Sequence, residues 1–143
     1  MNELIQTILV AVVGGVITYL VSITMKKGGV FGSALVVFVS GLVYKFWLAD
    51  NASGLIPTFA AVATTASYAG MVADKHVKKV WQMVVVGVIV GLVYYFAKPA
   101  FYLEGGEFRG VGGALGTMAA ISCFVFIGGK FVFGKLGGKK AAK

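Results

Sequence analysis

Residues Val36 to Phe46 read V-V-F-V-S-G-L-V-Y-K-F, and Val86 to Phe96, fifty positions later, read V-G-V-I-V-G-L-V-Y-Y-F. Both stretches contain Gly-Leu-Val-Tyr followed, two positions on, by Phe. Each stretch lies inside an apolar run long enough to cross a bilayer, for which a helix needs about 20 apolar residues. The pair therefore predicts a helical membrane protein with an internal repeat.

The composition of the whole chain agrees with this prediction. Of its 143 residues, 59% are hydrophobic and 13% are charged, and the mean hydropathy is +0.92. A typical soluble domain has about 45–50% apolar and about 25% charged residues. A soluble protein of this length exposes a large share of its surface to water, so it has too little interior to hide these side chains. We expect the lipid bilayer as solvent and one membrane domain over residues 1–143.

Five apolar segments are long enough to span the membrane as α-helices, and the connections between most of them are short. Strands are not expected, because the runs lack the alternating pattern of a barrel strand and lipid tolerates only helices and closed barrels. The fold class is therefore an all-α integral membrane protein with five transmembrane helices. The predicted spans are about 4–25, 30–49, 55–73, 80–97 and 111–133, with a basic tail at 134–143.

The distribution of lysines predicts the orientation. With five spans, ten lysines and one acid, Asp74, fall on the side of the C-terminus, which gives that side a net charge of +9. The other side has four acids and three basic residues, a net charge of −1. Short cytoplasmic loops carry the excess of Lys and Arg, so we expect the N-terminus outside and the C-terminus inside. Because topology accounts for the net charge of +8, no nucleic-acid partner is expected.

The same count gives the repeat a direction. The second and fourth spans run the same way through the membrane, and the third and fifth spans return. The simplest interpretation is one N-terminal helix followed by a duplicated two-helix hairpin, which is a parallel repeat rather than an inverted one. The alternative is that two low-complexity runs of Val and Gly resemble each other without duplication.

Hydroxyl side chains gather in the third span. Helical spacing places Thr64, Ser67 and Tyr68 near one face, with Thr65 beside them. Hydroxyls in a bilayer seek partners on other helices or on their own backbone. Two interpretations follow: a close helix–helix contact, or a path for an ion or small solute. Thr117 of the fifth span is a further candidate for such a path.

Pairs of glycines four residues apart occur in the last two spans. Gly87 and Gly91 form one pair, and Gly112 and Gly116 form the other. Such spacing lets helix backbones approach closely, so we expect these glycines at helix contacts. The glycine-rich start of the fifth span follows no strand and matches no nucleotide-binding pattern.

Lys45 lies inside the second predicted span, near its outer end. It lies beside Tyr44 and Trp47, which suits a lysine that extends its ammonium group to the membrane interface. The alternative is a cation at the mouth of a pore.

Groups for catalysis are absent from the sequence pattern. No Ser/His/Asp or Cys/His set and no pair of carboxylates inside a span is present, so we do not expect an enzyme, a cofactor or a metal site. His76 has Asp74 alone as a neighbouring ligand type, Cys123 lies in an apolar run, and Glu104 and Glu107 lie in a glycine-rich loop. The last two carboxylates bind a cation weakly at most.

Two functions remain open. In the first, copies of the chain assemble in the membrane and form a passive path for an ion or small solute. In the second, the chain is a non-catalytic accessory subunit of a larger membrane complex. In size and basic tail the chain is similar to phage holins, so a holin-like pore is a special case of the first. We expect a multi-pass protein of a prokaryotic or viral-host cytoplasmic membrane, with the bilayer and a second copy or another membrane subunit as partners.

Overall fold

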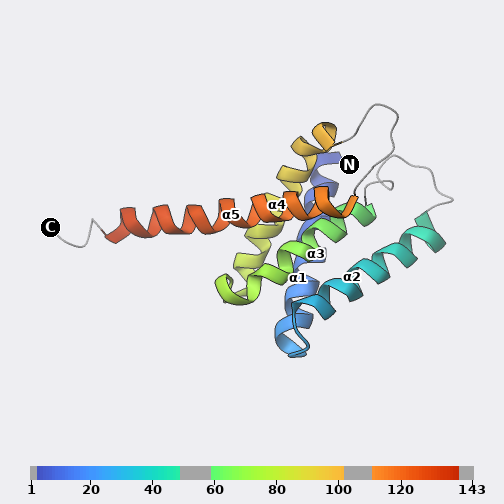
Figure 1. Cartoon of the computed structure of the whole chain (residues 1–143), viewed down its shortest axis with the longest axis horizontal. Helices are drawn as coiled ribbons and strands as arrows, with labels where there is room; N and C mark the ends of the chain where they lie inside the picture. Colours follow the sequence, from blue (N-terminus) through green and yellow to red (C-terminus); the bar gives the residue numbers. More distant parts are fainter. Residues whose placement is uncertain (1–2, 49–58, 102–110, 139–143) are drawn as a thin grey trace.

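The computed structural model describes residues 3–48, 59–101 and 111–138, and these residues form an all-helical bundle (Figure 1). A tight turn at residues 25–28 joins the first two helices, and Gly28 takes a φ of 83° there, a value that glycine adopts without strain. The elements in chain order are α1 (Glu3–Thr24), α2 (Gly29–Val43), the π-helical segment η1 (Tyr44–Leu48), α3 (Phe59–His76), α4 (Val80–Phe101) and α5 (Val111–Gly138).

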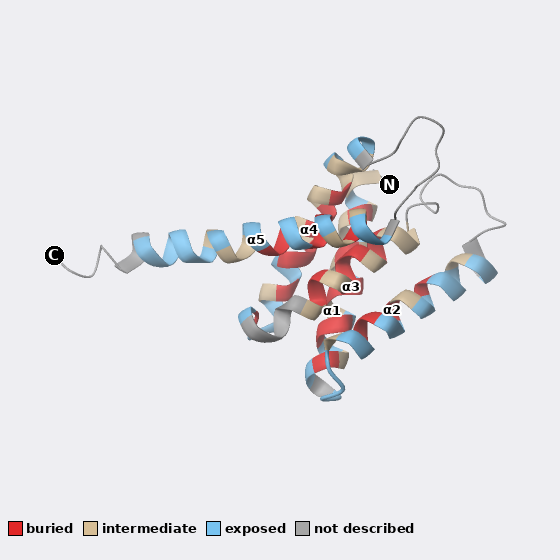
Figure 2. Ribbon diagram, viewed as in Figure 1, coloured by how far each residue is buried: buried red, intermediate tan, exposed pale blue. Residues whose placement is uncertain are grey.

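The centre of the bundle is built from small side chains. Ala66 of α3 and Ala11 of α1 are fully buried, and Gly70 lies so close to α1 that an added Cβ would come within 2.8 Å of Thr18 Cβ. Small residues let helix backbones approach in lipid, where no hydrophobic force drives the helices together. Figure 2 shows the buried residues on the sides of α1, α3 and α4 that face one another.

Among the glycine positions, the closest approach to another helix joins α4 to α1. A Cβ added at Gly87 would lie 2.7 Å from Val12 Cα, and one added at Gly91 would lie 2.7 Å from Ile8 Cα. Real Cβ atoms do not approach so closely, so both positions require glycine. A buried Met83 side chain lies one turn before Gly87 on the same helix, which extends this contact toward the start of α4.

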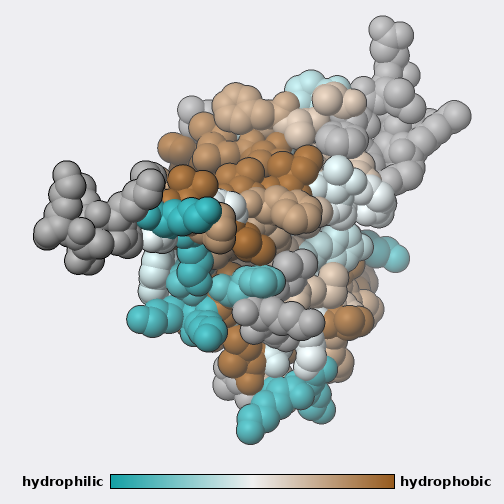
Figure 3. Space-filling model, turned by 60° about the vertical axis from the view of Figure 1, so that its left-hand side comes forward, coloured by the Kyte–Doolittle hydropathy of each residue, from teal (hydrophilic) through white to brown (hydrophobic). Residues whose placement is uncertain are grey.

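Four helices are long and apolar enough to cross a membrane among the residues described: Glu3–Ile23, Gly29–Phe46, Val80–Ala100 and Gly112–Lys135. Large apolar side chains on these helices point away from the bundle, as in Phe38, Phe96 and Phe124, which are 65%, 73% and 74% exposed. Figure 3 shows a broad hydrophobic surface with hydrophilic residues gathered to one side of it. Exposed apolar surface of this extent suits a hydrocarbon environment.

The third predicted span differs from the other four. Its helix, α3, covers 18 residues and does not reach the apolarity of a lipid-exposed span among the residues described. The physical reason is its position: α3 contacts all the other helices, so its surface meets protein and carries Ala, Thr, Ser and Gly. The first four residues of the predicted span, 55–58, lie outside the described residues.

Two predicted ends also move. The fourth helix continues to Phe101 instead of ending near residue 97, and it includes Pro99 in its last turn. The fifth helix continues to Gly138 instead of ending near residue 133, so the helix includes the first lysine and the glycines of the predicted basic tail. Its first half contacts α3 and α4, whereas its second half projects beyond the bundle (Figure 1).

We predict that Gly91→Ala lowers the free energy of unfolding by about 1–3 kcal/mol, because the new methyl group must displace the α1 backbone. Gly128→Ala is the matched control, since nothing lies within 4 Å of a Cβ at Gly128. That change should leave stability equal or raise it by up to about 1 kcal/mol, the helix preference of Ala over Gly. Titration with a denaturing detergent in mixed micelles measures both. Equal stabilities of the two variants would contradict the α1–α4 contact.

Candidate functional site

The threonine and serine hydroxyl groups of α3 have hydrogen-bond partners inside the chain. Thr64 Oγ1 donates to Ala60 O at 2.7 Å and Thr65 Oγ1 to Ala61 O at 2.8 Å. These are carbonyls one turn earlier on the same helix, the usual partners of a hydroxyl that has no water. Thr65 is fully buried, as is Ser67, whereas Thr64 is half-buried. The enclosed hydroxyls therefore do not line an open passage within one chain.

A hydrogen bond between two hydroxyls joins α2 to α3. Ser33 Oγ lies 2.9 Å from Ser67 Oγ, and both side chains are buried. Ser67 also lies 2.8 Å from Thr64 O, so its proton is directed to that carbonyl when Ser33 donates. This contact fixes the position of α2 against the central helix.

Ser33 was missed by the sequence reasoning, which looked for polar groups in the third span alone. A signal was present in the sequence, because Ser33 and Ser40 are seven residues apart and so lie on one face of a helix. Both side chains are buried in the structure. A buried serine on an apolar helix is a useful marker of the face that meets another helix.

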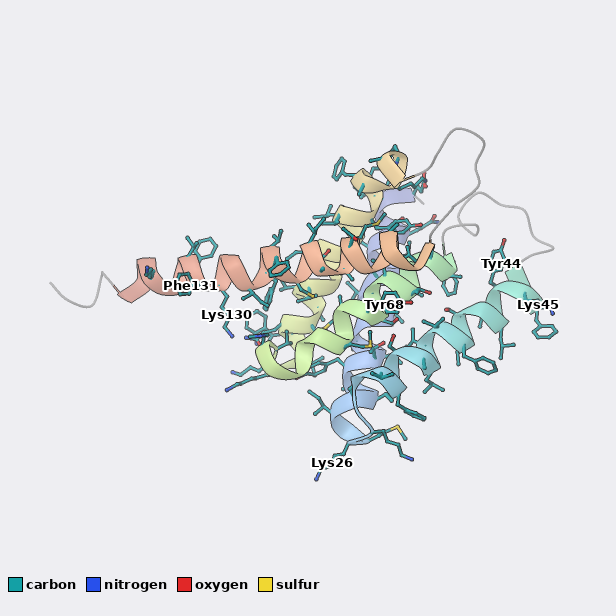
Figure 4. The ribbon with its side chains drawn as sticks, in the orientation of Figure 1. Lys26, Tyr44, Lys45, Tyr68, Lys130 and Phe131 are labelled. Atoms are coloured by element: carbon teal, nitrogen blue, oxygen red, sulfur yellow. The ribbon has the colours of Figure 1, made fainter. Side chains whose placement is uncertain are left out.

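The other path candidates lie apart from this pair. Tyr68 is half-buried on α3 (Figure 4), while Thr117 is exposed on α5 and donates to Gly113 O at 2.9 Å. The residues of α5 that are turned into the bundle are a different set: Leu115, Met118, Ala119, Ser122 and Cys123. Thr117 therefore lies on the outer face of its helix, and the structure does not bring it to the hydroxyls of α3.

The two predicted glycine pairs have different surroundings. Gly87 and Gly91 lie against α1, as described above, whereas nothing lies within 4 Å of a Cβ at Gly112 or Gly116. Around the second pair, α5 presents a strip of small residues away from the bundle. We name this strip the outer face of α5; it consists of Gly112, Gly113, Gly116, Thr117 and Ala120, of which Gly116 is half-exposed and the rest are exposed.

Lys45 is exposed in η1, and its Nζ lies 5.9 Å from the centre of the Phe46 ring. Figure 4 shows it at the end of α2, far from Tyr68. Such a contact between a cation and an exposed ring is worth about 0.5–1 kcal/mol. The geometry is that of a lysine and aromatic pair at the edge of an apolar helix.

Polar contacts also hold the two ends of α1. Lys98 Nζ lies 2.5 Å from Glu3 Oε1, with both side chains partly exposed, and this ion pair joins the end of α4 to the start of α1. Tyr19 Oη donates to Val77 O at 3.3 Å, which joins α1 to the connection after α3. Lys130 Nζ donates to His76 O at 3.5 Å and so places α5 beside the end of α3.

Metal-ligand types do not gather in groups of three or more His, Cys, Asp or Glu within the parts of the chain that the structure describes. Cys123 is buried and its Sγ lies 3.8 Å from Ala69 O. Glu104 and Glu107 lie outside the described residues.

Comparisons with known protein families, with curated proteins and with solved structures find no match to this chain.

We predict that Ser33 and Ser67 are energetically coupled. A double-mutant cycle with Ser33→Ala and Ser67→Ala should give a coupling free energy of about 0.5–1.5 kcal/mol, the range for hydrogen bonds between helices in a membrane. The control pair is Ser33→Ala with Thr117→Ala, whose hydroxyl bonds its own helix on the far side of α5 and should give no coupling. Equal coupling free energies in the two cycles would show that the Ser33–Ser67 hydrogen bond does not stabilise the contact between α2 and α3.

Proposed function

We propose that this chain is a subunit of an oligomeric membrane assembly, in which copies meet through the outer face of α5 and a passive path for an ion or small solute lies between them. The observation that supports the proposal is the open strip of small residues, which faces no other helix among the residues described.

Residue size distinguishes this face from the rest of the apolar surface. Elsewhere the exposed residues include many large side chains, such as Leu9 and Val13 on α1 or Phe31 and Phe38 on α2. Large flexible side chains suit contact with lipid, while glycine and alanine let a second helix approach closely. The outer face of α5 is thus better suited to another helix than to lipid.

The character of the buried polar groups supports a passive path. In the described residues, the buried polar groups are hydroxyls of serines and threonines and of Tyr19 and Tyr94, together with the thiol of Cys123. Proton relays and pumps in membranes use Asp, Glu or His within the spans, and the bundle interior offers none there. Between copies, the hydroxyl of Thr117 would be the polar group on the meeting faces. Thr65 and Ser67 are then structural, and Thr64 and Tyr68 are only partly open to the surface.

A second candidate function is that of an accessory subunit in a larger membrane complex. The second half of α5 favours it, because this half projects from the bundle with Phe131 and Phe133 each at least 66% exposed. A helical segment with large exposed apolar side chains suits insertion between other membrane helices. In this case α5 binds a different protein rather than a second copy.

We also propose the orientation with the N-terminus outside and all five helices crossing, α3 being enclosed by the others. Contacts support a division of charge between two ends. Lys130 meets the end of α3 at His76, next to Lys78 and Lys79, whereas Lys98 meets Glu3 at the opposite end of α1. The first group would face the cytoplasm.

Burial supports the duplicated hairpin within this proposal. Three positions of α2 that are buried, Ser33, Val36 and Ser40, correspond at a spacing of fifty to Met83, Val86 and Val90, which are buried in α4. The correspondence fails at Gly41, which is exposed, and Gly91, which lies against α1. The two glycines differ because α2 lies at the edge of the bundle whereas α4 lies inside it.

The assembly is tested by placing a large side chain on the outer face of α5. We predict that Gly113→Leu converts the oligomer to a monomer by native mass spectrometry, because leucine holds two helix backbones apart. Gly41→Leu is the matched control: it is also exposed, with open space around it, and it should leave the oligomer intact. In liposomes, Gly113→Leu should also abolish solute flux.

The path itself needs a milder change. Thr117→Val removes the hydroxyl at nearly constant shape, so the oligomer should persist while flux falls. A wild-type chain that is monomeric and without flux for every solute would contradict the proposal. Co-purification of a larger membrane protein, lost in Gly113→Leu, would instead support the accessory function.

Orientation is tested in a Cys123→Ala background with one new cysteine at a time. A thiol reagent that does not cross membranes should label Lys45→Cys in intact cells and leave Lys78→Cys unlabelled; both native side chains are exposed. Permeabilised cells should label both, as the control. The reverse pattern would overturn the orientation.

A further inference from the structure

A groove opens between α1 and α2 on the apolar surface of the bundle. Its volume is about 350 Å³. Leu9, Val13 and Ile17 form the wall on α1, and Val39 stands on the α2 wall. These side chains are 44–55% exposed, so the groove is open along its length to whatever surrounds the helices.

The shape of the groove follows from how α1 and α2 are joined. Near the turn the two helices touch, since a Cβ at Gly32 would lie 2.9 Å from Thr18 O. Beyond this point α2 diverges from α1 (Figure 1). The floor between them is Gly14 against Ala63 of α3, where a Cβ at Gly14 would lie 3.3 Å from Ala63 O. Small residues therefore form the floor of the groove and leave the space between the two diverging helices unfilled.

Water does not suit this groove. A buried water needs two to four polar partners, and Ser40 is the one side chain with a polar group on the lining. Its Oγ already donates to Val37 O at 3.0 Å. An apolar space of this kind is filled by apolar atoms, because its lining otherwise loses dispersion contacts.

A second helix does not fit whole inside the groove. The wall on α1 runs over nine residues, from Leu9 to Ile17, a length of about 12 Å. A helix of that length and about 10 Å in diameter takes up more than about 900 Å³, which is well above the volume of the groove. A single hydrocarbon chain fits better. If a methylene group takes about 30 Å³, the share of one water molecule in the liquid, the groove holds about twelve.

We propose that the groove between α1 and α2 binds one acyl chain of a membrane phospholipid. Both helices that wall the groove are long and apolar enough to cross a bilayer, and the lining residues of both walls lie inside those spans; in a membrane the surrounding material there is acyl chains. The bound chain holds α2 at its angle to α1, while the Ser33–Ser67 hydrogen bond holds the start of α2, next to the turn. This assignment does not depend on the oligomer or on a solute path.

The first test fills the groove. In chain purified from membranes in mild detergent, native mass spectrometry should show a retained phospholipid. Val39→Phe places a ring in the groove and should remove that lipid. Val30→Phe, the same change at an exposed position of α2 outside the groove, should retain it. Retention by both variants, or by neither the wild type nor the control, would overturn the proposal.

The second test labels the wild-type chain. A phospholipid with a photoreactive diazirine in its acyl chain is incorporated into membranes that contain the wild-type chain. Adducts should concentrate on Leu9, Val13 and Val39 rather than on more exposed apolar residues such as Phe124 and Phe131. Uniform labelling would mean ordinary surrounding lipid and would overturn the proposal. So would a disulfide between two copies carrying Val39→Cys and Cys123→Ala, which would place a second copy in the groove.

Discussion

The bundle depends on the contact between the backbones of α1 and α4 at Gly87 and Gly91. In lipid, helices gain little from burying apolar side chains, so close packing and interhelical hydrogen bonds hold them together. Two polar contacts secure the ends of this pair: Glu3 meets Lys98 at one end, and Tyr19 meets Val77 near the other. With α1 and α4 held in this way, α3 packs against both, and α2 and α5 occupy the edges.

This arrangement uses most of the polar chemistry of the chain for structure. The hydroxyls of Thr65 and Ser67 are fully buried. Thr65 donates to the carbonyl of Ala61 on its own helix, and Ser67 contacts Ser33 of α2, so both hydroxyls have their partners inside the chain. The two surfaces on which the proposals rest are on the outside: the small residues of the outer face of α5, and the groove between α1 and α2.

The sequence predicted the membrane class and the number of helices, but it predicted the site only in part. Both glycine pairs have the same spacing, yet Gly91 touches the α1 backbone while Gly112 faces open space. The spacing of the glycines shows that a helix could pack closely on that face, but it does not determine whether another helix lies there. Ser33 was overlooked for the same reason, because its partner Ser67 lies 34 residues away. The weaker apolarity of α3 was visible in its threonines and serines, and its enclosed position explains it.

The sequence by itself determined that the described chain is helical and apolar on a scale that suits a bilayer. Those properties are local, since the length of an apolar run and the need of each backbone group for a partner decide them. Only the tertiary structure decided which glycines meet a backbone, which hydroxyls are enclosed, and where α2 diverges from α1. Each of these depends on contacts between residues far apart in the chain, such as Gly32 with Thr18 at the closed end of the groove and Gly14 with Ala63 on its floor.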